Sequence, residues 1–425
     1  MTARLLAGVD VAVDASLATH LDRHGRLPPL RTPGERAGML DTLDRSGLLG
    51  RGGAGFPAGR KMRTVAAGSK RGARPVVLAN GCEGEPASRK DTVLLTRAPH
   101  LVLDGIQTAA MMVGADEAHL VVQRGSATST AVRHAVSERA RTDAVCVTVH
   151  ELPHRYVASE ESALVQWLNG GEAKPAFTPP RPFERGVAGR PTLVNNVETL
   201  AHLALLARHG AEWFRRVGDP DEPGTLLVSV AGPPDVRRVI EVPTGTTVGD
   251  LLTRAGCDPT AAQAVLVGGY FGTWLPTGLA LHTPLSHRGL RAVGGALGAG
   301  IVAALPRSSC GVTETARVAA YLAAESAGQC GPCINGLPAI ADALRRLARG
   351  PWDERLAPAL DRWLAVVNGR GACRHPDGAT RFVASALATF SDDVTAHRSG
   401  RPCAASGTPG WLPLPSARQA EPGWR

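Results

Sequence analysis

The sequence predicts an α/β domain, then a small α+β domain, then a C-terminal helical bundle. Three observations predict this order. Short apolar segments alternate with helical segments in the first part of the chain, which is typical of a mostly parallel sheet. Two strand-like segments joined at Gly-Pro-Pro begin a second unit near residue 224. From residue 313 to about residue 397 the apolar spacing is largely helical.

The first domain is placed at residues 1–220. Its expected helices are residues 33–46, 91–114 and 127–141. Its expected strands are residues 75–80, 118–123 and 144–149. The strands are short and apolar and alternate with the helices, so a parallel sheet is favoured.

The second domain, residues 221–305, begins with an expected hairpin. Residues 225–231 and 237–242 are strand-like. Thr247 is placed to cap a helix that ends at residue 255, and a further strand covers residues 264–267. The order strand, strand, helix, strand indicates a ubiquitin-like fold.

The rest of the chain divides into a helical bundle, residues 306–398, and a tail, residues 399–425. Long stretches of Ala, Leu and Arg predict the bundle. The tail is rich in Pro, Gly and Ser, so we expect it to be disordered.

The composition is that of a globular protein with a basic surface. The net charge is +9, and the arginines are scattered without a dense run or interleaved aromatic residues. We therefore expect no nucleic-acid partner, and a surface that suits an acidic protein. The longest apolar run, residues 292–305, is too short to span a bilayer, and the N-terminus is unlike a signal peptide. Eight unevenly spaced cysteines do not form a disulfide framework, so a cytoplasmic location is expected.

Residues 50–59 form the first candidate site, a glycine-rich loop. Glycines let backbone N–H groups approach an anion or a flat ring closely. The loop follows an expected helix and not a strand, which is the wrong context for a Rossmann fingerprint, so a flexible turn is the alternative. Lys61, one of only four lysines, lies just past the loop and suits a phosphate or a reduced flavin. The candidate residues are Gly50, Arg51, Gly52, Gly53, Ala54, Gly55, Phe56, Gly59 and Lys61.

Asn80, Glu83 and Glu85 follow the strand expected at residues 75–80. Ligands of open α/β sheets bind at the carboxyl ends of strands. The two carboxylates could accept hydrogen bonds from ribose hydroxyls, and a solvated acidic turn is the alternative.

Two further polar clusters follow. Glu160 and Glu161 are candidates for orienting a cofactor, or they are favourable carboxylates in the first turn of a helix. Asn195, Asn196 and Thr199 offer short donors for a phosphate or a ring carbonyl, or they form a turn or a helix cap.

In the sequence ESAGQCGPC at residues 325–333, two residues separate Cys330 from Cys333, and Cys373 follows forty residues later. A pair at this spacing can share a metal ion or an iron–sulfur cluster. A cluster normally takes four cysteines, but the position three before Cys330 is Ala327. Three thiolates could hold a [3Fe–4S] cluster, zinc, or a [4Fe–4S] cluster with a fourth ligand such as His375, and three metal-free cysteines are the alternative.

Together and in this order, these motifs resemble the flavin-carrying, NADH-oxidising subunit of respiratory complex I and its relatives in hydrogenases and formate dehydrogenases. The resemblance extends from about residue 30 to residue 395. It implies an FMN- and NADH-binding α/β domain, a ubiquitin-like SLBB domain and a four-helix bundle that holds a [4Fe–4S] cluster. In the family, hydride passes from NADH to FMN, and electrons leave one at a time through iron–sulfur centres.

The chain departs from this family near each expected cofactor. Ala327 replaces a cluster cysteine, Cys82 replaces an aspartate beside the flavin, and Ser159 replaces a glycine. Phe56 retains one of the aromatic residues that sandwich NADH. The other two positions hold Thr64 and Arg181.

The resemblance implies an FMN-dependent NAD(P)H dehydrogenase that feeds a ferredoxin-like or [2Fe–2S] protein, or a membrane-bound complex with which it would associate peripherally. FMN is expected on Lys61, Asn80, Asn195, Asn196 and Thr199. NAD(H) or NADP(H) is expected on the loop of residues 50–59 and on Phe56. The cofactors would be oriented by Glu83, Glu85, Glu160 and Glu161. A cluster-free flavoprotein redox module and a non-catalytic scaffold are the two alternatives.

Overall fold

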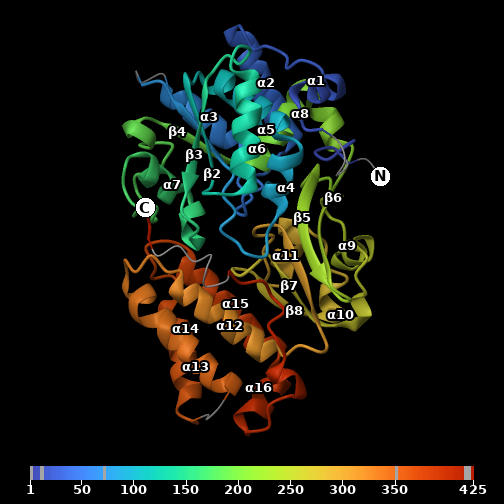
Figure 1. The fold of residues 1–425 in the computed structure, drawn as a ribbon, viewed down its shortest axis with the longest axis vertical. Helices are drawn as coiled ribbons and strands as arrows, with labels where there is room; N and C mark the ends of the chain where they lie inside the picture. Colours follow the sequence, from blue (N-terminus) through green and yellow to red (C-terminus); the bar gives the residue numbers. More distant parts are fainter. Residues whose placement is uncertain (1–2, 10–13, 70–72, 350–352, 416–422) are drawn as a thin grey trace.

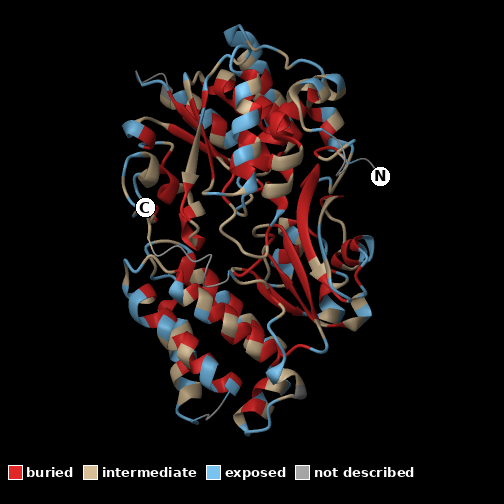
Figure 2. Cartoon of the chain, viewed as in Figure 1, coloured by how far each residue is buried: buried red, intermediate tan, exposed pale blue. Residues whose placement is uncertain are grey.

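The computed structural model describes residues 3–9, 14–69, 73–349, 353–415 and 423–425. Figure 1 shows an N-terminal α/β part at the top, a second sheet at the right and a helical part at the bottom. The buried residues in Figure 2 gather on the strands of both sheets and on the inward faces of the helices. The α/β class expected from the sequence is confirmed, with a parallel sheet in the first part.

The first sheet has the strand order β3-β2-β1-β4, and all neighbours are parallel. Its strands are β1 (Val76–Asn80), β2 (Glu117–Gln123), β3 (Val147–Leu152) and β4 (Thr192–Asn196). The surrounding helices are α1 (Leu17–His24), α2 (Pro33–Ser46), α3 (Ala58–Ser69), α4 (Lys90–Arg97), α5 (Pro99–Val113), α6 (Ala127–Arg139), α7 (Glu161–Leu168) and α8 (Val197–Arg215). The central strands are apolar throughout because helices cover both faces of the sheet.

Two boundaries in this domain differ from the expected ones. The helix expected at residues 91–114 is two helices, α4 and α5, because Pro99 disfavours a helical conformation at Ala98. The strand expected at residues 144–149 begins only at Val147. Before it, Val145 pairs with the Gln107 side chain, which replaces a strand partner (2.7 and 3.0 Å).

The second sheet has the order β6-β5-β9-β7-β8. Its strands are β5 (Thr225–Gly232), β6 (Val236–Pro243), β7 (Ala262–Val267), β8 (Thr273–Pro276) and β9 (Ile301–Pro306). Helices α9 (Val248–Ala255), α10 (Thr277–Ala280) and α11 (His287–Ala292) accompany it. The expected hairpin is the antiparallel pair β5–β6, and Thr247 caps α9 by accepting the N–H of Asp250 (3.1 Å).

The helical part contains α12 (Gly311–Ala324), a π-helical turn (Pro332–Gly336), α13 (Leu337–Arg349), α14 (Leu356–Val367), α15 (His375–Thr389) and α16 (Ser391–Arg398). No helix in the described stretches of the chain is long and apolar enough to cross a bilayer.

The prediction that the whole tail is disordered is wrong for residues 399–415 and 423–425. Leu412 is 1% exposed, and the N–H groups of Trp411 and Leu412 donate to the Glu314 carboxylate at 3.0 and 2.9 Å. The carbonyl of Trp424 accepts the N–H of Ala173 in the first domain (2.9 Å). Composition predicted disorder because it does not reveal these few anchoring contacts. The tail residues 416–422 lie outside the described residues.

A single carboxylate on β6 holds the start of the chain. Glu241 accepts the N–H groups of Arg4, Leu5 and Leu6 at 2.9, 3.0 and 3.0 Å, and the Thr225 hydroxyl at 2.5 Å. Burial raises the pKa of Glu241, and these hydrogen bonds oppose that rise. The edge of the first domain is therefore completed by a residue of the second.

Candidate functional site

The glycine-rich loop lies over the carboxyl ends of β1 and β4. These strands are parallel neighbours, and Asn80 stands opposite Asn196 in the register. The N–H of Arg51 donates to the Thr199 hydroxyl (2.9 Å) at the start of α8. A Cβ added at Gly52 would lie 3.3 Å from the Cβ of Asn196. The structure therefore brings together the loop, the β1 end and the Asn-Asn motif, as the sequence predicted.

The loop is closed locally and fits tightly against the second domain. Gly50 donates its N–H to the Phe56 carbonyl (2.9 Å). Gly55 has φ +61°, and a Cβ there would lie 2.4 Å from the ring of His287, so a side chain is excluded at this position. Phe56 is 46% exposed, with the Arg60 guanidinium 5.8 Å from its ring centroid. The tip of the loop thus presents an aromatic face to solvent.

A buried ion cluster lies under this edge. The Lys90 ammonium lies 2.7 Å from Asp91, 2.9 Å from Glu198 and 3.4 Å from the Asn196 side-chain oxygen. Burial lowers the pKa of Lys90, but the two carboxylates outweigh burial and raise it. Burial raises the pKa of Asp91 to about 6, and the charge of Lys90 opposes that rise. Glu198 also accepts the N–H of Leu227 (2.9 Å), which ties β5 to this cluster.

Lys61 is placed differently. It lies in the first turns of α3, and its ammonium is 3.2 Å from Glu161 at the start of α7. The two side chains are 23% and 34% exposed, so Lys61 and Glu161 remain accessible at the mouth of the site.

Two of the predicted carboxylates are already engaged. Glu83 accepts the N–H groups of Asp91 and Thr92 (3.0 and 2.9 Å) and so holds the start of α4. Glu160 caps α7 by accepting the N–H groups of Ser162 and Ala163 (2.9 and 3.3 Å). Both support helix N-termini, as carboxylates do. Their direct role toward a cofactor stays a prediction.

Glu85 lies between the sheet edge and the helical part. It accepts the Tyr156 hydroxyl (2.7 Å) and the N–H of Tyr270 (2.9 Å), while its second oxygen is buried without a partner among the described residues. Burial raises the pKa of Glu85 to about 7, and the two hydrogen bonds oppose the rise. The Tyr156 ring packs edge-on against Phe271 and His375 (4.8 and 5.8 Å between centroids).

The two asparagines leave one donor free for a ligand. Asn80 accepts the N–H of Cys82 (3.1 Å) and donates to the Ser159 carbonyl (2.9 Å). The side-chain N–H₂ of Asn195 is buried and has no partner within the described parts of the chain. A buried amide donor without a partner can be satisfied by an acceptor atom of a flat ring, as in FMN.

The three predicted metal-binding thiols are close enough for their charges to interact. Burial raises the pKa of Cys333 to about 12, and Cys330 and then Cys373 add to the rise. Burial also raises the pKa of Cys373, with added contributions from Glu160 and Cys330. A bound cation would favour the thiolate form of these cysteines. Their role as cluster ligands stays a prediction, and Ala327 supplies no thiol for a fourth position.

His375 does not direct its Nε2 toward these thiols. Nε2 donates to the Leu322 carbonyl (2.8 Å), and burial lowers the pKa of His375 to about 4. Glu325, at the start of the cysteine motif, accepts the N–H of Tyr156 (2.8 Å) and pairs with Arg155 (3.1 Å). The cysteine motif is thereby attached directly to the first domain.

Glu198 and Tyr156 were not predicted as site residues. Glu198 follows Asn195 and Asn196, and an acidic residue within an apolar helical segment was the available signal in the sequence. Tyr156 is one of three tyrosines, and a scarce aromatic residue next to the paired glutamates marked it.

Two family models match the chain. Residues 43–205 match the Nuo51 FMN-binding domain. Residues 313–397 match the iron–sulfur binding region of NADH-ubiquinone oxidoreductase-F.

Individual proteins match over most of the chain. An F-type NADH-quinone oxidoreductase subunit of Rhizobium meliloti is 31% identical over 423 residues, which cover 94% of this chain and 98% of that protein. The corresponding F-type protein of Escherichia coli is 30% identical and is covered over 84% of each chain. A chain of an NAD⁺-reducing [NiFe]-hydrogenase in the H₂-reduced state superposes with a TM-score of 0.81 at 30% identity, covering 93% of this chain and 67% of that one.

Proposed function

Because the chain belongs to the family of FMN-binding subunits of NADH-quinone oxidoreductases, it is an NADH dehydrogenase by enzyme class, and we propose that it passes electrons singly to an iron–sulfur protein. Its cofactors are FMN, NAD(H) and an iron–sulfur cluster. The observation that carries the proposal is the meeting of the glycine loop, the ends of β1 and β4, and the unpartnered donor of Asn195.

The residues at this edge position the cofactors and do no covalent chemistry. FMN, when bound, accepts hydride and releases electrons one at a time, so no nucleophilic side chain is needed. Asn195 would donate to the ring, and Asn80 and Asn196 would fix the strand ends beneath it. Lys61 supplies an accessible positive charge for the phosphate. Phe56 offers its exposed ring to the dinucleotide.

The finer architecture is also proposed. We assign the second sheet and α9 to a ubiquitin-like SLBB domain at residues 221–305, because the order β5, β6, α9, β7 matches that fold. The helices of residues 306–398 are assigned to the iron–sulfur-binding bundle. The FMN/NAD(P)H-binding domain then covers residues 1–220.

The cluster is proposed to be ligated by Cys330, Cys333 and Cys373, with a non-thiolate fourth position. A corner without a thiolate is exchangeable, so the cluster is expected to be sensitive to oxygen. The acceptor is proposed to be a ferredoxin-like or [2Fe–2S] protein or subunit, since the relatives are named as subunits of NADH-quinone oxidoreductases. A net charge of +9 suits an acidic partner of this kind.

Flavin content tests the proposal. Lys61→Ala is expected to lower bound FMN sharply, because the accessible cation at the loop is lost. Lys174→Ala is the matched control, since the Lys174 ammonium pairs with its near neighbour Glu172 (2.9 Å). Stoichiometric flavin in Lys61→Ala protein would contradict the assignment.

A visible spectrum of anaerobic protein before and after NADH addition separates the alternatives. Flavin bands that bleach together with a broad cluster absorbance are expected. Bleaching flavin without iron would leave a cluster-free redox module, and a colourless protein would leave a scaffold.

A further inference from the structure

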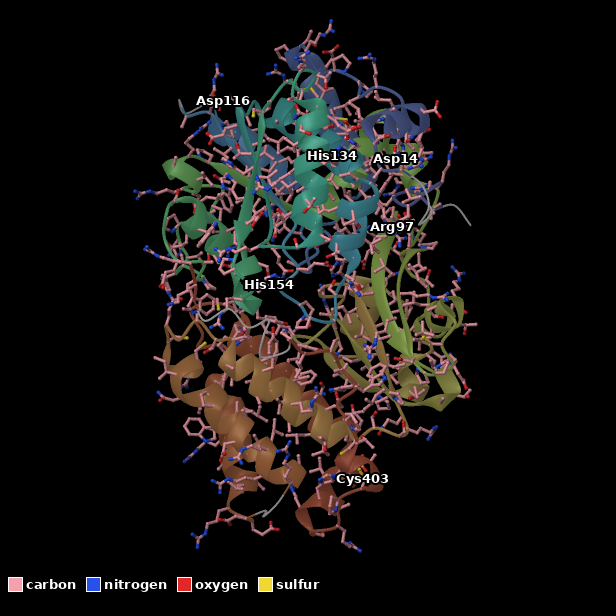
Figure 3. All side chains as sticks on the ribbon, viewed as in Figure 1. Asp14, Arg97, Asp116, His134, His154 and Cys403 are labelled. Atoms are coloured by element: carbon pink, nitrogen blue, oxygen red, sulfur yellow. The ribbon has the colours of Figure 1, made fainter. Side chains whose placement is uncertain are left out.

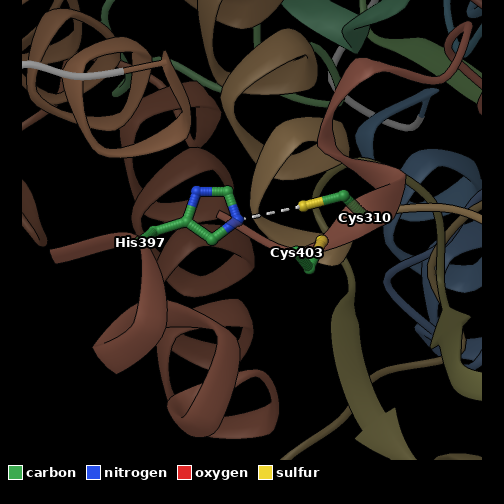
Figure 4. Close-up of side chains that lie close together, drawn as sticks. All are labelled: Cys310, His397 and Cys403. Atoms are coloured by element: carbon green, nitrogen blue, oxygen red, sulfur yellow. Dashed lines mark hydrogen bonds between the residues drawn. The ribbon is translucent and has the colours of Figure 1, made fainter. Parts of the chain in front are cut away.

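A second group of metal-ligating side chains lies in the helical part, apart from Cys330, Cys333 and Cys373. Cys310, His397 and Cys403 place their ligand atoms within 4.8 Å of one another. Figure 4 shows the His397 ring and both thiols converging on one point. In Figure 3, Cys403 lies near the lower end of the molecule, well below His154 of the first domain.

The imidazole is already oriented for binding. The Nδ1 of His397 donates to the Leu347 carbonyl (3.1 Å), so its Nε2 carries the lone pair. That Nε2 lies 3.5 Å from the Cys310 thiol. A histidine ligand whose other nitrogen donates to a carbonyl is the usual arrangement in metal sites.

The thiols come from two other segments. Cys310 is 2% exposed and stands at the N-terminus of α12, where its sulfur accepts the N–H of Thr313 (3.4 Å). Cys403 comes from the tail, beyond α16. Three separate segments therefore contribute one ligand each, which packing alone does not require.

We propose that Cys310, His397 and Cys403 bind a zinc ion. Two sulfurs and one imidazole nitrogen are a donor set that selects zinc over magnesium or calcium. Tetrahedral zinc with its usual bond lengths separates a sulfur and a nitrogen ligand by about 3.6 Å. The distance between Cys310 and His397 is 3.5 Å before any metal is bound. Binding forms two Zn–S bonds and one Zn–N bond and releases the protons of the two thiols.

Three protein ligands leave one tetrahedral position, which a water molecule can fill. Asp393 lies one turn before His397 on α16. A carboxylate at this place can accept a hydrogen bond from a zinc-bound water.

The ion fastens the tail to the helical part. After Cys403, the chain turns at Ala404–Gly407, and the Thr313 hydroxyl donates to the Ser406 carbonyl (3.5 Å). Trp411 and Leu412 then donate to Glu314, one turn along α12 from Cys310. The zinc site is thus the first of several anchors that hold the tail against α12.

Elemental analysis of the holoprotein tests this assignment. Protein expressed in zinc-supplemented medium is expected to hold one zinc per chain, in addition to its iron and flavin. Cys403→Ser is expected to lose the zinc and keep iron and flavin. Cys146→Ser, at an exposed thiol of the first domain, is the matched control and keeps all three.

Measurements on the wild type test the proposal even where the Cys403→Ser protein folds poorly. Cobalt substitution of the wild type should give sulfur-to-cobalt charge-transfer absorbance, and zinc chelation should speed tryptic cleavage after Arg398 in the wild type only. Three results would overturn the proposal: wild-type protein without zinc, zinc that persists in Cys403→Ser, or iron that is lost with Cys403. A peptide carrying a Cys310–Cys403 disulfide would also overturn it, in favour of a redox pair.

Discussion

The polar edge of the first sheet and the thiols of the helical part differ in whether their side chains already have partners within the chain. At the sheet edge, Glu83, Glu160 and Lys90 already have partners within the chain. At the thiols, burial and neighbouring cysteines raise the pKa of Cys333, and burial, Glu160 and Cys330 raise that of Cys373. We therefore expect the first region to keep its shape without a cofactor and the second to depend more on its metal centre.

The largest expected effect is on the thiol side of this comparison. Cys333→Ser removes a buried thiolate, so the iron content should fall to background and electron delivery to one-electron acceptors should stop. NADH should still bleach the flavin, because the sheet edge is untouched. Iron analysis and acceptor assays check both points, with Cys257→Ser, at a buried thiol just after α9, as control. Loss of flavin in Cys333→Ser would break the comparison.

On the other side, Lys90→Met should destabilise the apoprotein by about 3–5 kcal/mol, since it leaves Asp91 and Glu198 buried without a countercharge. Urea unfolding monitored by circular dichroism measures this. Adding Glu198→Gln should recover part of the loss. A loss of unfolding free energy below about 1 kcal/mol, the usual size for an exposed ion pair, would show that the buried ion cluster does not stabilise the sheet edge.

Ala327→Cys should make the cluster at the thiol site less dependent on an exchangeable fourth ligand. A thiolate at the fourth corner replaces an exchangeable ligand, so loss of the cluster in air should slow. The decay of cluster absorbance in air, compared with the wild type and with Ala323→Cys, measures this. Equal decay rates would place residue 327 away from the cluster.

A smaller effect concerns how stability depends on pH. One carboxylate oxygen of Glu85 is buried without a hydrogen-bond partner among the described residues. Its pKa is raised from 4.5 to about 7, so between these values the folded state binds a proton that the unfolded state has lost. Stability of the flavin-free protein should therefore fall as pH rises from about 4.5 to 7. Glu85→Gln should flatten this part of the profile, and thermal melts over that range check it. An unchanged slope would contradict the assignment.

The smallest expected effect is on dinucleotide choice. Arg181 is exposed, and its backbone N–H donates to Glu184 (2.8 Å). Because the side chain is exposed, its guanidinium can pair with a 2′-phosphate, stack on adenine or remain in solvent. Arg181→Phe should shift the ratio of NADPH to NADH reduction rates toward NADH if it reads the phosphate. A ratio that does not move would rule Arg181 out.

Spacing along the chain predicted those groups that lie within one turn or at one strand end. Cys330 with Cys333, and Asn195 with Asn196, are of this kind. The site of Cys310, His397 and Cys403 could not be predicted, because Cys310 and His397 are 87 residues apart and their meeting depends on tertiary packing.

Two other differences have local causes. Pro99 was a visible signal for the break between α4 and α5, but the apolar spacing on both sides obscured it. Glu83 was expected to face a ligand, and only the structure shows that its carboxylate turns back to the start of α4. Sequence patterns therefore identified the functional elements better than the direction of individual side chains.

The hold of Glu241 on the first residues of the chain has a consequence for biosynthesis. Leu5 and Glu241 are 236 residues apart, so the ribosome needs about 10–50 s to proceed from one to the other. During that interval the N–H groups of Arg4, Leu5 and Leu6 lack this acceptor, although the Arg4 guanidinium can already donate to the Trp213 and Phe214 carbonyls of the first domain. The N-terminal edge of the first domain therefore gains its last hydrogen bonds only after the hairpin of the second domain has left the exit tunnel.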